Sequence, residues 1–255
     1  MSNTKKNIKF KFTIALALVL QWSNFLADPA YSRYTPLIAQ LDGQHLKQKE
    51  PDGSKRGRPG GRTGTGSRGD CPSVNLPLTA LIPANNQGLT VAEYPRFWIF
   101  VPNKSNKIIS GEFVLQDETD NDVYRTNFNL PATPGIVTLN LEKTTPLQIN
   151  KQYQWYFKLY CSQQKFSNPL FVRGWIQRIA IDPNLKRQLK AAVTPEQRFN
   201  IYYRNNIWYE AVTELAERQL IKSQNNSLLG DWDNLLKRIG LEYLISQPIV
   251  GEVKI

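Results

Sequence analysis

The sequence restricts the catalytic and metal sites that depend on histidine. The chain has one histidine, His45, and it lies in a Gly- and Arg-rich stretch that we do not expect to fold. A Ser-His-Asp or Cys-His site, or a zinc site built on histidine, needs that residue beside its partners in the folded part. We therefore predict no such catalytic or metal site. We also predict no cofactor, because the region 60–69 lacks the strand and helix that flank a phosphate-binding loop.

Carboxylates and aromatic rings are the remaining groups that could serve catalysis or binding. A hydrolase that uses two carboxylates stays open, because Asp and Glu number 21 and no spacing along the chain identifies such a pair. Exposed tryptophans stack sugars or anchor protein partners, although most tryptophans belong to a core. The five in the expected folded part are Trp98, Trp155, Trp175, Trp208 and Trp232.

The most acidic stretch runs from Asp117 to Asp122, with the sequence DETDND. It lies between two strand patterns and is rich in turn-forming residues, which predicts a solvated hairpin tip. Calcium binding is the alternative, but the glycine and terminal glutamate of an EF-hand loop are missing.

Two cysteines, Cys71 and Cys161, predict one disulfide if the chain is exported. Cys71 stands where the Gly-rich stretch meets the expected domain, and Cys161 ends the apolar row of a strand. The bond would join the start of the folded region to the sheet. A pair of buried free thiols is the alternative.

The N-terminus has the layout of a secretory signal peptide. Four lysines, Lys5, Lys6, Lys9 and Lys11, precede the uncharged apolar run 12–20, which is too short to span a bilayer. We assign residues 1–39 to the signal peptide, although neither candidate cleavage site, at Ala27 or Ala39, has a small-x-small sequence. An uncleaved anchor is the alternative. We expect a protein of the periplasm, outer envelope or medium, and no later stretch could cross a membrane.

Most of the net charge of +11 lies outside the expected domain. Residues 1–39 carry five basic and one acidic side chain, and residues 40–70 carry seven and four, which leaves +4 for the last 185 residues. Residues 40–70 are rich in glycine and poor in apolar residues, and so predict a flexible basic arm. Its Arg56–Pro59 (RGRP) matches the core of an AT-hook, but the match is short and follows an export signal. Nucleic acid is therefore disfavoured as a partner.

Residues 71–181 change to short runs of aromatic and β-branched residues separated by turn formers. Seven such runs predict a β-sandwich of the immunoglobulin or fibronectin type III kind. The expected strands are 78–82, 97–101, 111–117, 123–130, 135–141, 152–161 and 170–180. In the clearest strand, 152–161, apolar residues alternate with mostly polar ones, so one face is buried and the other faces water. The apolar row consists of Tyr153, Trp155, Phe157, Leu159 and Cys161. Tyr153 follows a turn, as in a tyrosine corner.

Residues 182–255 predict a helical segment, packed on the sandwich or forming a small bundle. Asp182 and Pro183 are suited to open one helix, and Thr194 with Gln197 forms a capping-box pattern at a second start. From there the apolar stripe continues as one long helix or as two joined near Asn205. The stretch 225–227 breaks it, and a last helix ends at Gly240. A loose tetratricopeptide-like spacing near Trp208 has no second copy.

Several segments together resemble one family. They are Gly57–Cys71 (GRPGGRTGTGSRGDC), Leu78–Pro102 (LTALIPANNQGLTVAEYPRFWIFVP), Phe113–Phe128 (FVLQDETDNDVYRTNF), Thr133–Leu141 (TPGIVTLNL), Gln152–Cys161 (QYQWYFKLYC), Phe171–Ile179 (FVRGWIQRI) and Ile207–Glu217 (IWYEAVTELAE). This set resembles a cyanobacterial exported-protein family catalogued as domain of unknown function nine-two-eight. The resemblance implies an extracytoplasmic location and supplies no catalytic residue.

We therefore expect a non-enzymatic binding or interaction module of the envelope or secreted fraction. Its partner would be an envelope or secreted protein or a polysaccharide. A carbohydrate-active hydrolase with paired carboxylates is the alternative, and it requires an aromatic-lined cleft that holds two acids.

Overall fold

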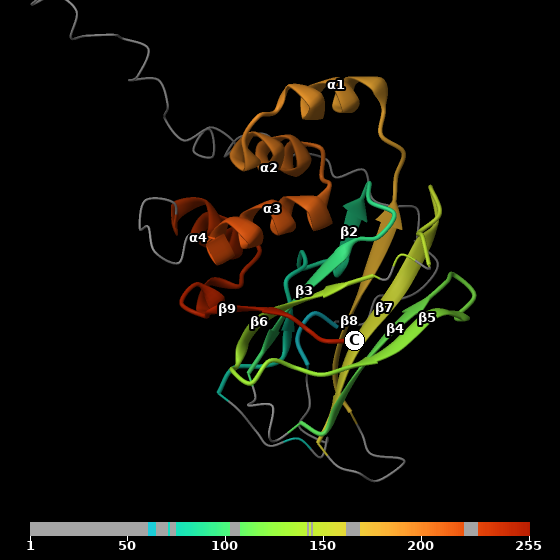
Figure 1. Ribbon diagram of the computed structural model, residues 1–255, viewed down its shortest axis with the longest axis vertical. Helices are drawn as coiled ribbons and strands as arrows, with labels where there is room; N and C mark the ends of the chain where they lie inside the picture. The colour runs from blue at the N-terminus through green and yellow to red at the C-terminus, as the bar shows by residue number, and fades with distance from the viewer. Residues whose placement is uncertain are drawn as a thin grey trace, which may run out of the picture. The chain divides into compact units, whose positions relative to one another are not determined.

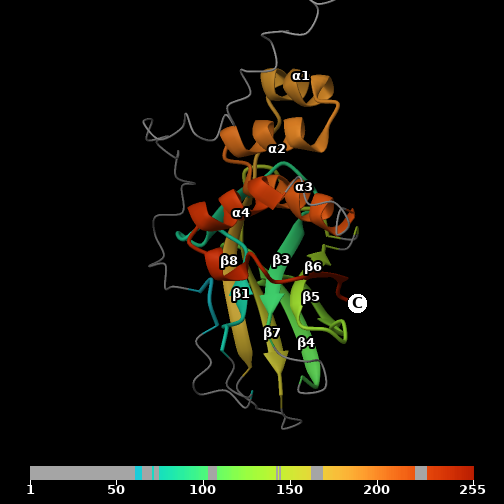
Figure 2. The same cartoon turned by 90° about the vertical axis from the view of Figure 1, so that its left-hand side faces the viewer.

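The protein, seen here in a computed structural model, consists of two facing β-sheets with a group of helices beyond one end (Figures 1 and 2). The structure describes residues 61–64, 71, 75–102, 108–141, 143, 145–161, 169–221 and 229–255. The predicted signal peptide and residues 40–60 of the predicted arm lie outside them. The predicted fold class, mainly β with C-terminal helices, is confirmed.

Each sheet combines strands from distant parts of the chain. The first has the order β1-β3-β6-β9, with β1 (Thr79–Ala80), β3 (Arg96–Val101), β6 (Gly135–Asn140) and β9 (Ile249–Glu252). The second has the order β2-β8-β7-β4-β5, with β2 (Gln87–Thr90), β8 (Leu170–Arg178), β7 (Gln152–Tyr160), β4 (Ser110–Gln116) and β5 (Asp122–Phe128). The seven strands expected from the sequence correspond to β1 and to β3 through β8.

Two strands, β2 and β9, were not indicated by the sequence pattern. Each joins its sheet in parallel, β2 beside β8 and β9 beside β6. Both are only four residues long and contain a glycine, so neither shows a period of two. The segment 182–255 is therefore not helical throughout, because its end returns to the first sheet.

Aromatic rings fill the space between the two sheets. The ring of Phe97 on β3 lies 4.8 Å from that of Phe113 and 5.3 Å from that of Trp155, centroid to centroid. The predicted tyrosine corner is present, since the Gln148 N–H donates to the Tyr153 hydroxyl at 3.1 Å. The outer face of β7 is less exposed than predicted, because Gln154 and its neighbour at position 152 are also buried.

The helices begin where their capping residues predicted. Asp182 caps α1 (Pro183–Ala191), and Thr194 with Gln197 forms the capping box of α2 (Pro195–Arg204). The chain then turns at Asn206, which has a φ of 58°, into α3 (Trp208–Ile221), so the long stripe is two helices. After α4 (Leu229–Arg238), Gly240 adopts a φ of +67°, followed by the short 3-10 helix η5 (Glu242–Leu244). The expected break at 225–227 lies outside the described residues.

Helix α3 connects the other helices to the sheets. It packs against β2, β3 and β9, while α2 and α4 pack against α3 itself. Helix α1 contacts α2 and lies farthest from the sheets (Figure 1). The Trp208 indole N–H donates to the carbonyl of Leu81 at 2.9 Å, which secures the start of α3 beside β1. Side chains of α3 are therefore held in fixed positions relative to the strands.

Residues 61–64, which we assigned to the arm, are part of the fold. The Gly64 N–H donates to Leu78 O at 2.7 Å, and the Arg173 N–H of β8 donates to Gly61 O at 2.8 Å. These four residues thus bond to the segment before β1 and to a strand of the other sheet. A Cβ at Gly61 would lie 2.4 Å from the Cγ of Arg173, so the close approach requires glycine. The folded part begins before residue 71, where we had placed its start.

Candidate functional site at the Glu210 cavity

A carboxylate on α3 organises the turn that follows β2. Glu210 Oε1 accepts hydrogen bonds from the Thr90 hydroxyl at 2.5 Å and from the N–H groups of Val91 and Ala92 at 3.0 and 2.9 Å. The residues from β2 into this turn would otherwise leave buried donors unsatisfied. Glu210 therefore links α3 to the connection between the sheets.

The second carboxylate oxygen of Glu210 is in a different situation. Its Oε2 is buried, and no described residue donates a hydrogen bond to it. Burial raises the pKa of Glu210 above its ordinary value, although the hydrogen bonds from Thr90 and Ala92 act in the opposite direction. This carboxyl group is thus held firmly on one side and lacks a partner on the other.

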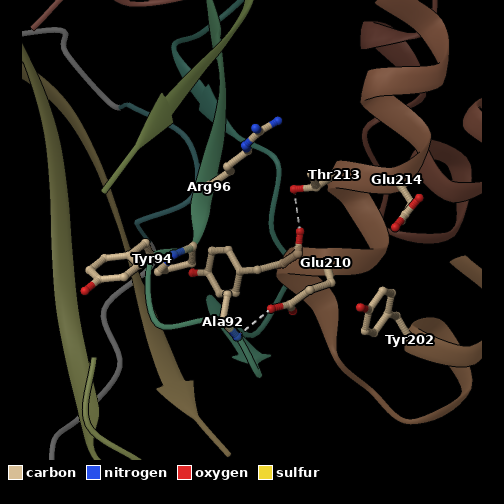
Figure 3. Close-up of a pocket in the computed structure, with 9 residues that line it drawn as sticks. Ala92, Tyr94, Arg96, Tyr202, Glu210, Thr213 and Glu214 are labelled. Carbon is tan, nitrogen blue, oxygen red and sulfur yellow. Dashed lines mark hydrogen bonds between the residues drawn. The ribbon is translucent and has the colours of Figure 1, made fainter. Parts of the chain in front are cut away.

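A cavity of about 170 Å³ lies beside Glu210, between α3, α2 and the chain entering β3 (Figure 3). We call it the Glu210 cavity. Its walls are formed by Ala92, Tyr94, Pro95, Arg96, Tyr202, Tyr209, Glu210, Thr213 and Glu214. Tyr202 lies on the α2 side with its hydroxyl directed toward Glu210 (Figure 3). The cavity therefore combines tyrosine rings with two carboxylates.

The other charged groups of the walls have partners. Arg198 on α2 binds Glu214 with two hydrogen bonds, of 2.7 and 3.0 Å, one to each carboxylate oxygen. Arg96 forms an ion pair with Glu217, which lies one helical turn after Glu214 on α3. Burial raises the pKa of Tyr202, and the nearby Glu210 and Glu214 add to this effect. The charge on Glu210 has no comparable counterion among the described residues.

Two further hydrogen-bonding groups of the walls, the hydroxyls of Thr213 and Tyr209, are also engaged. The Trp98 indole donates to the Thr213 hydroxyl at 3.0 Å, and that hydroxyl donates to the Tyr209 carbonyl at 2.7 Å. The Tyr209 hydroxyl is bonded as well, to Trp155. The wall therefore contains a buried carboxylate oxygen without a donor, an arrangement suited to holding a hydrogen-bond donor or a cation.

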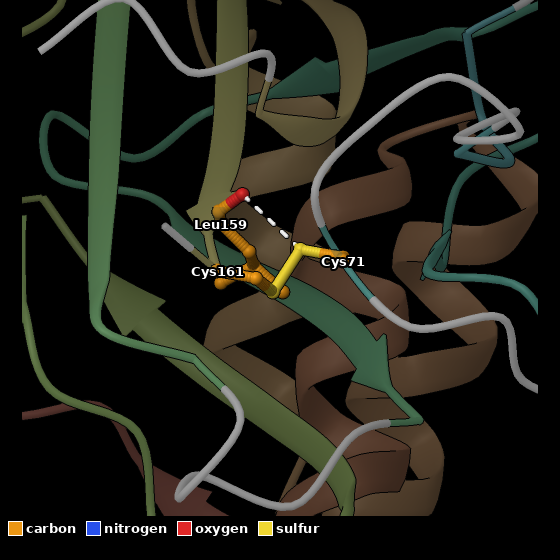
Figure 4. The surroundings of a disulfide bond; sticks show 3 residues. All are labelled: Cys71, Leu159 and Cys161. Atoms are coloured by element: carbon orange, nitrogen blue, oxygen red, sulfur yellow. Dashed lines mark hydrogen bonds between the residues drawn. A yellow bond between two sulfur atoms is a disulfide. The ribbon is translucent and has the colours of Figure 1, made fainter. Parts of the chain in front are cut away.

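The predicted disulfide joins Cys71 to Cys161, with the two Cα atoms 4.9 Å apart (Figure 4). The bond closes a separation of 90 residues and ties the segment before β1 to the end of β7. Cys71 Sγ lies 3.8 Å from Leu159 O, a contact and not a hydrogen bond, because a disulfide sulfur carries no proton. Neither Cys71 nor Cys161 is among the residues that line the Glu210 cavity.

The acidic run 117–122 forms the tip between β4 and β5, as predicted. Asp117 Oδ1 accepts bonds from the Thr119 N–H and hydroxyl and from the Asn121 N–H, which lower the pKa of Asp117. A second hollow, of about 190 Å³, lies beside this tip. In the part of the chain that the structure describes, no three His, Cys, Asp or Glu side chains gather as a metal site.

The five tryptophans of the folded part are all buried, with exposed fractions of 1 to 9%. They serve the core and are not presented to a sugar. His45 and the AT-hook match at 56–59 lie outside the described residues. Across the described ranges no helix has the length and apolar character needed to cross a membrane.

Glu210 was not identified from the sequence as a site residue. The only signal was its spacing of four from Glu214, and carboxylates at this spacing are common on exposed helix faces. Nothing in the sequence indicated that the turn at Thr90 would meet it. The site depends on a contact across 120 residues.

A search of curated proteins found none that matches this chain. A protein-family model, described as Domain of Unknown Function (DUF928), matches residues 63–249, from the Thr63 bridge to the start of β9. This range covers well over half of the sequence and includes the whole Glu210 cavity. The chain therefore belongs to the DUF928 family.

Proposed function

We propose that this protein is an exported, non-enzymatic binding module of the cell envelope or secreted fraction, and that it binds its ligand at the Glu210 cavity. The observation that carries the proposal is that the two carboxylate oxygens of Glu210 lie in different environments. One oxygen is held by three donors, and the other is buried beside a cavity without a partner. A buried, unpartnered acceptor in the wall of a cavity is suited to recognition.

Two features support export. The first is the pattern of lysines followed by an apolar run at 12–20, which is typical of a signal peptide. The second is the Cys71–Cys161 disulfide, because such bonds persist mainly in oxidising compartments. We propose the periplasm, outer envelope or medium as the location, and a cyanobacterial source on the family resemblance alone.

We further propose that the body is a variant of the immunoglobulin-like sandwich. The tyrosine corner at Tyr153 and the two facing sheets support this proposal. The parallel pairs β2–β8 and β6–β9 are departures from an all-antiparallel arrangement. The partner that we propose is an envelope or secreted protein or a polysaccharide.

The proposal can be tested by capture from envelope extracts. The baits are the chain 40–255, the same chain lacking 40–60, and the variant Ala92→Leu, which adds side-chain volume to the cavity wall. We expect one protein or polysaccharide to be retained by the first two baits and lost from the third. Equal capture by all three, or capture by none, would contradict a binding role for the cavity.

A carbohydrate-active hydrolase is the second candidate, because Glu210 and Glu214 line one cavity together with tyrosines. Carboxyl groups one helical turn apart are close enough in principle for such a pair. The pairing of Glu214 with Arg198, and the three bonds to Glu210 Oε1, make the candidate weaker. Hydrolysis of a glycoside panel, abolished by both Glu210→Gln and Glu214→Gln, would establish the hydrolase and refute the non-enzymatic module.

A further inference from the structure

We propose that the Glu210 cavity binds an organic ammonium group, of the kind carried by a lysine side chain or an unacetylated amino sugar. The inference rests on the proposed binding function and names the ligand chemistry of the same site. Three features carry it: the charge balance of the walls, the tyrosine rings, and the geometry of the one free oxygen.

The charge balance leaves one carboxylate without a counterion. The charged and phenolic groups of the wall around Glu210 are Tyr202 from α2, Tyr209 and Glu214 from α3, and Tyr94 and Arg96 from the chain entering β3. Arg198 of α2 adds a positive charge through its bond to Glu214. Each arginine is paired, Arg198 with Glu214 and Arg96 with Glu217. When Glu210 is ionised, it and these two ion pairs together carry three negative and two positive charges, so a ligand of charge +1 would neutralise the cluster.

The tyrosine rings favour an organic cation. Tyr94 and Tyr202 line the cavity, and an ammonium close to a ring face is stabilised by the ring quadrupole. A volume of about 170 Å³ has room for several carbon atoms beside the charged nitrogen. A bare metal ion fits poorly, because the described residues bring no three His, Cys, Asp or Glu side chains together.

The geometry of Glu210 favours an ammonium over a guanidinium. A guanidinium binds a carboxylate best through both oxygens. Glu210 Oε1 already accepts three hydrogen bonds, so only Oε2 is left for a ligand. Oε2 is buried in a residue that lines the cavity, and a single charged nitrogen there is attracted to the ionised carboxylate without displacing the bonds to Oε1.

The test compares charged probes with uncharged counterparts by isothermal titration calorimetry on the chain 40–255. The probes are n-butylamine against n-butanol, Nα-acetyl-lysine against Nα-acetyl-norleucine, and glucosamine against N-acetylglucosamine. We expect each bound amine to bind at least about tenfold more tightly than its counterpart, as for a charge-assisted hydrogen bond. The second and third pairs distinguish a lysine from an amino sugar as the source.

Variants connect the binding to Glu210. We expect Glu210→Gln to weaken amine binding about tenfold or more, and Glu242→Gln, an exposed glutamate on η5, to leave it unchanged. In the wild type, binding of n-butylamine, which stays protonated, should release a proton and strengthen as the pH rises, because binding requires the ionised carboxylate. This measurement needs no variant, so it decides the matter even if Glu210→Gln does not fold.

Three results would overturn the inference. They are equal binding of amines and their uncharged counterparts, binding by Glu210→Gln as tight as by the wild type, or no binding of any amine. If a partner is still captured from extracts while one of these results holds, the binding module stands and only the ammonium site is refuted. Loss of capture with retained amine binding would refute the partner instead.

Discussion

The indole N–H of Trp155 on β7 donates to the hydroxyl of Tyr209 on α3 at 2.7 Å, and that hydroxyl donates in turn to the carbonyl of Trp175 at 3.2 Å. All three groups are buried. This chain of bonds attaches α3, and with it the wall of the Glu210 cavity, to the second sheet.

Replacing Tyr209 by phenylalanine should destabilise the fold by about 1–3 kcal/mol, because a buried indole N–H loses its acceptor and a carbonyl loses its donor. Urea unfolding followed by tryptophan fluorescence measures the change. Tyr156→Phe, on the half-buried outer face of β7, is the matched control and should change stability little. Equal stability of Tyr209→Phe and the wild type would refute the role of this bond.

The pH dependence of stability should report the buried carboxyl of Glu210. Because burial raises its pKa above 4.5, the native state holds this proton more tightly than the unfolded state does. The stabilising contribution is present below the unfolded pKa and is lost as the pH rises through the native pKa. The free energy of unfolding of the wild type minus that of Glu210→Gln should therefore fall as the pH increases from 4.5. A difference independent of pH would contradict this assignment.

Two glycines should respond in opposite directions to alanine. At Gly111 a Cβ would lie 2.1 Å from the ring of Phe128, so Gly111→Ala should cost about 1–3 kcal/mol through overpacking. At Gly230, in α4, no atom lies within 4 Å of the added Cβ, and alanine should stabilise the helix by about 0.5–1 kcal/mol. Thermal unfolding of the two variants distinguishes them, and shifts of the same sign would contradict the packing at β4.

Arg62 should stabilise the junction between the start of the fold and α4. Its Nη1 donates to Ile239 O at 2.5 Å, just beyond the C-terminus of α4, and to Ile82 O at 3.3 Å. Arg62→Ala should cost about 1–2 kcal/mol, because a helix C-terminus favours a positive charge and a hydrogen-bond donor. Lys151→Ala, at an exposed turn, serves as the control. An unchanged denaturant midpoint for Arg62→Ala would show that the Arg62 side chain adds nothing to stability.

Removing the disulfide should lower stability by about 2–5 kcal/mol, since it closes a long loop in the unfolded chain. The double variant Cys71→Ala and Cys161→Ala leaves no thiol that could mispair. In the wild type purified without reductant, alkylation should modify neither cysteine, as intact mass will show. Two alkylated thiols would mean that the bond is absent in the native protein.

Much of the fold follows from local patterns. The alternation from Tyr153 to Leu159 identified β7, and the capping residues Asp182 and Thr194 set the starts of α1 and α2. Such signals are readable because they depend on neighbours within a few positions. Strands β2 and β9 were missed since they are short, and they form only because β8 and β6 offer them parallel partners.

The Glu210 site could not be predicted in the same way. A glutamate on an amphipathic helix is ordinary in sequence, and its role depends on the turn at Thr90, 120 residues earlier. The same is true of Gly61, whose need for glycine arises from the approach of Arg173.

By itself the sequence indicated the strand and helix periods, the capping residues, the tyrosine corner, and one disulfide as the simplest state of its two cysteines, because each of these inferences depends on spacing or on residue type alone. The tertiary structure decided which strands became neighbours, where the folded part begins, and that one carboxyl oxygen of Glu210 would be buried without a partner. These features arise from contacts between residues far apart in the chain. Burial and the loss of water at such contacts are properties of the assembled fold.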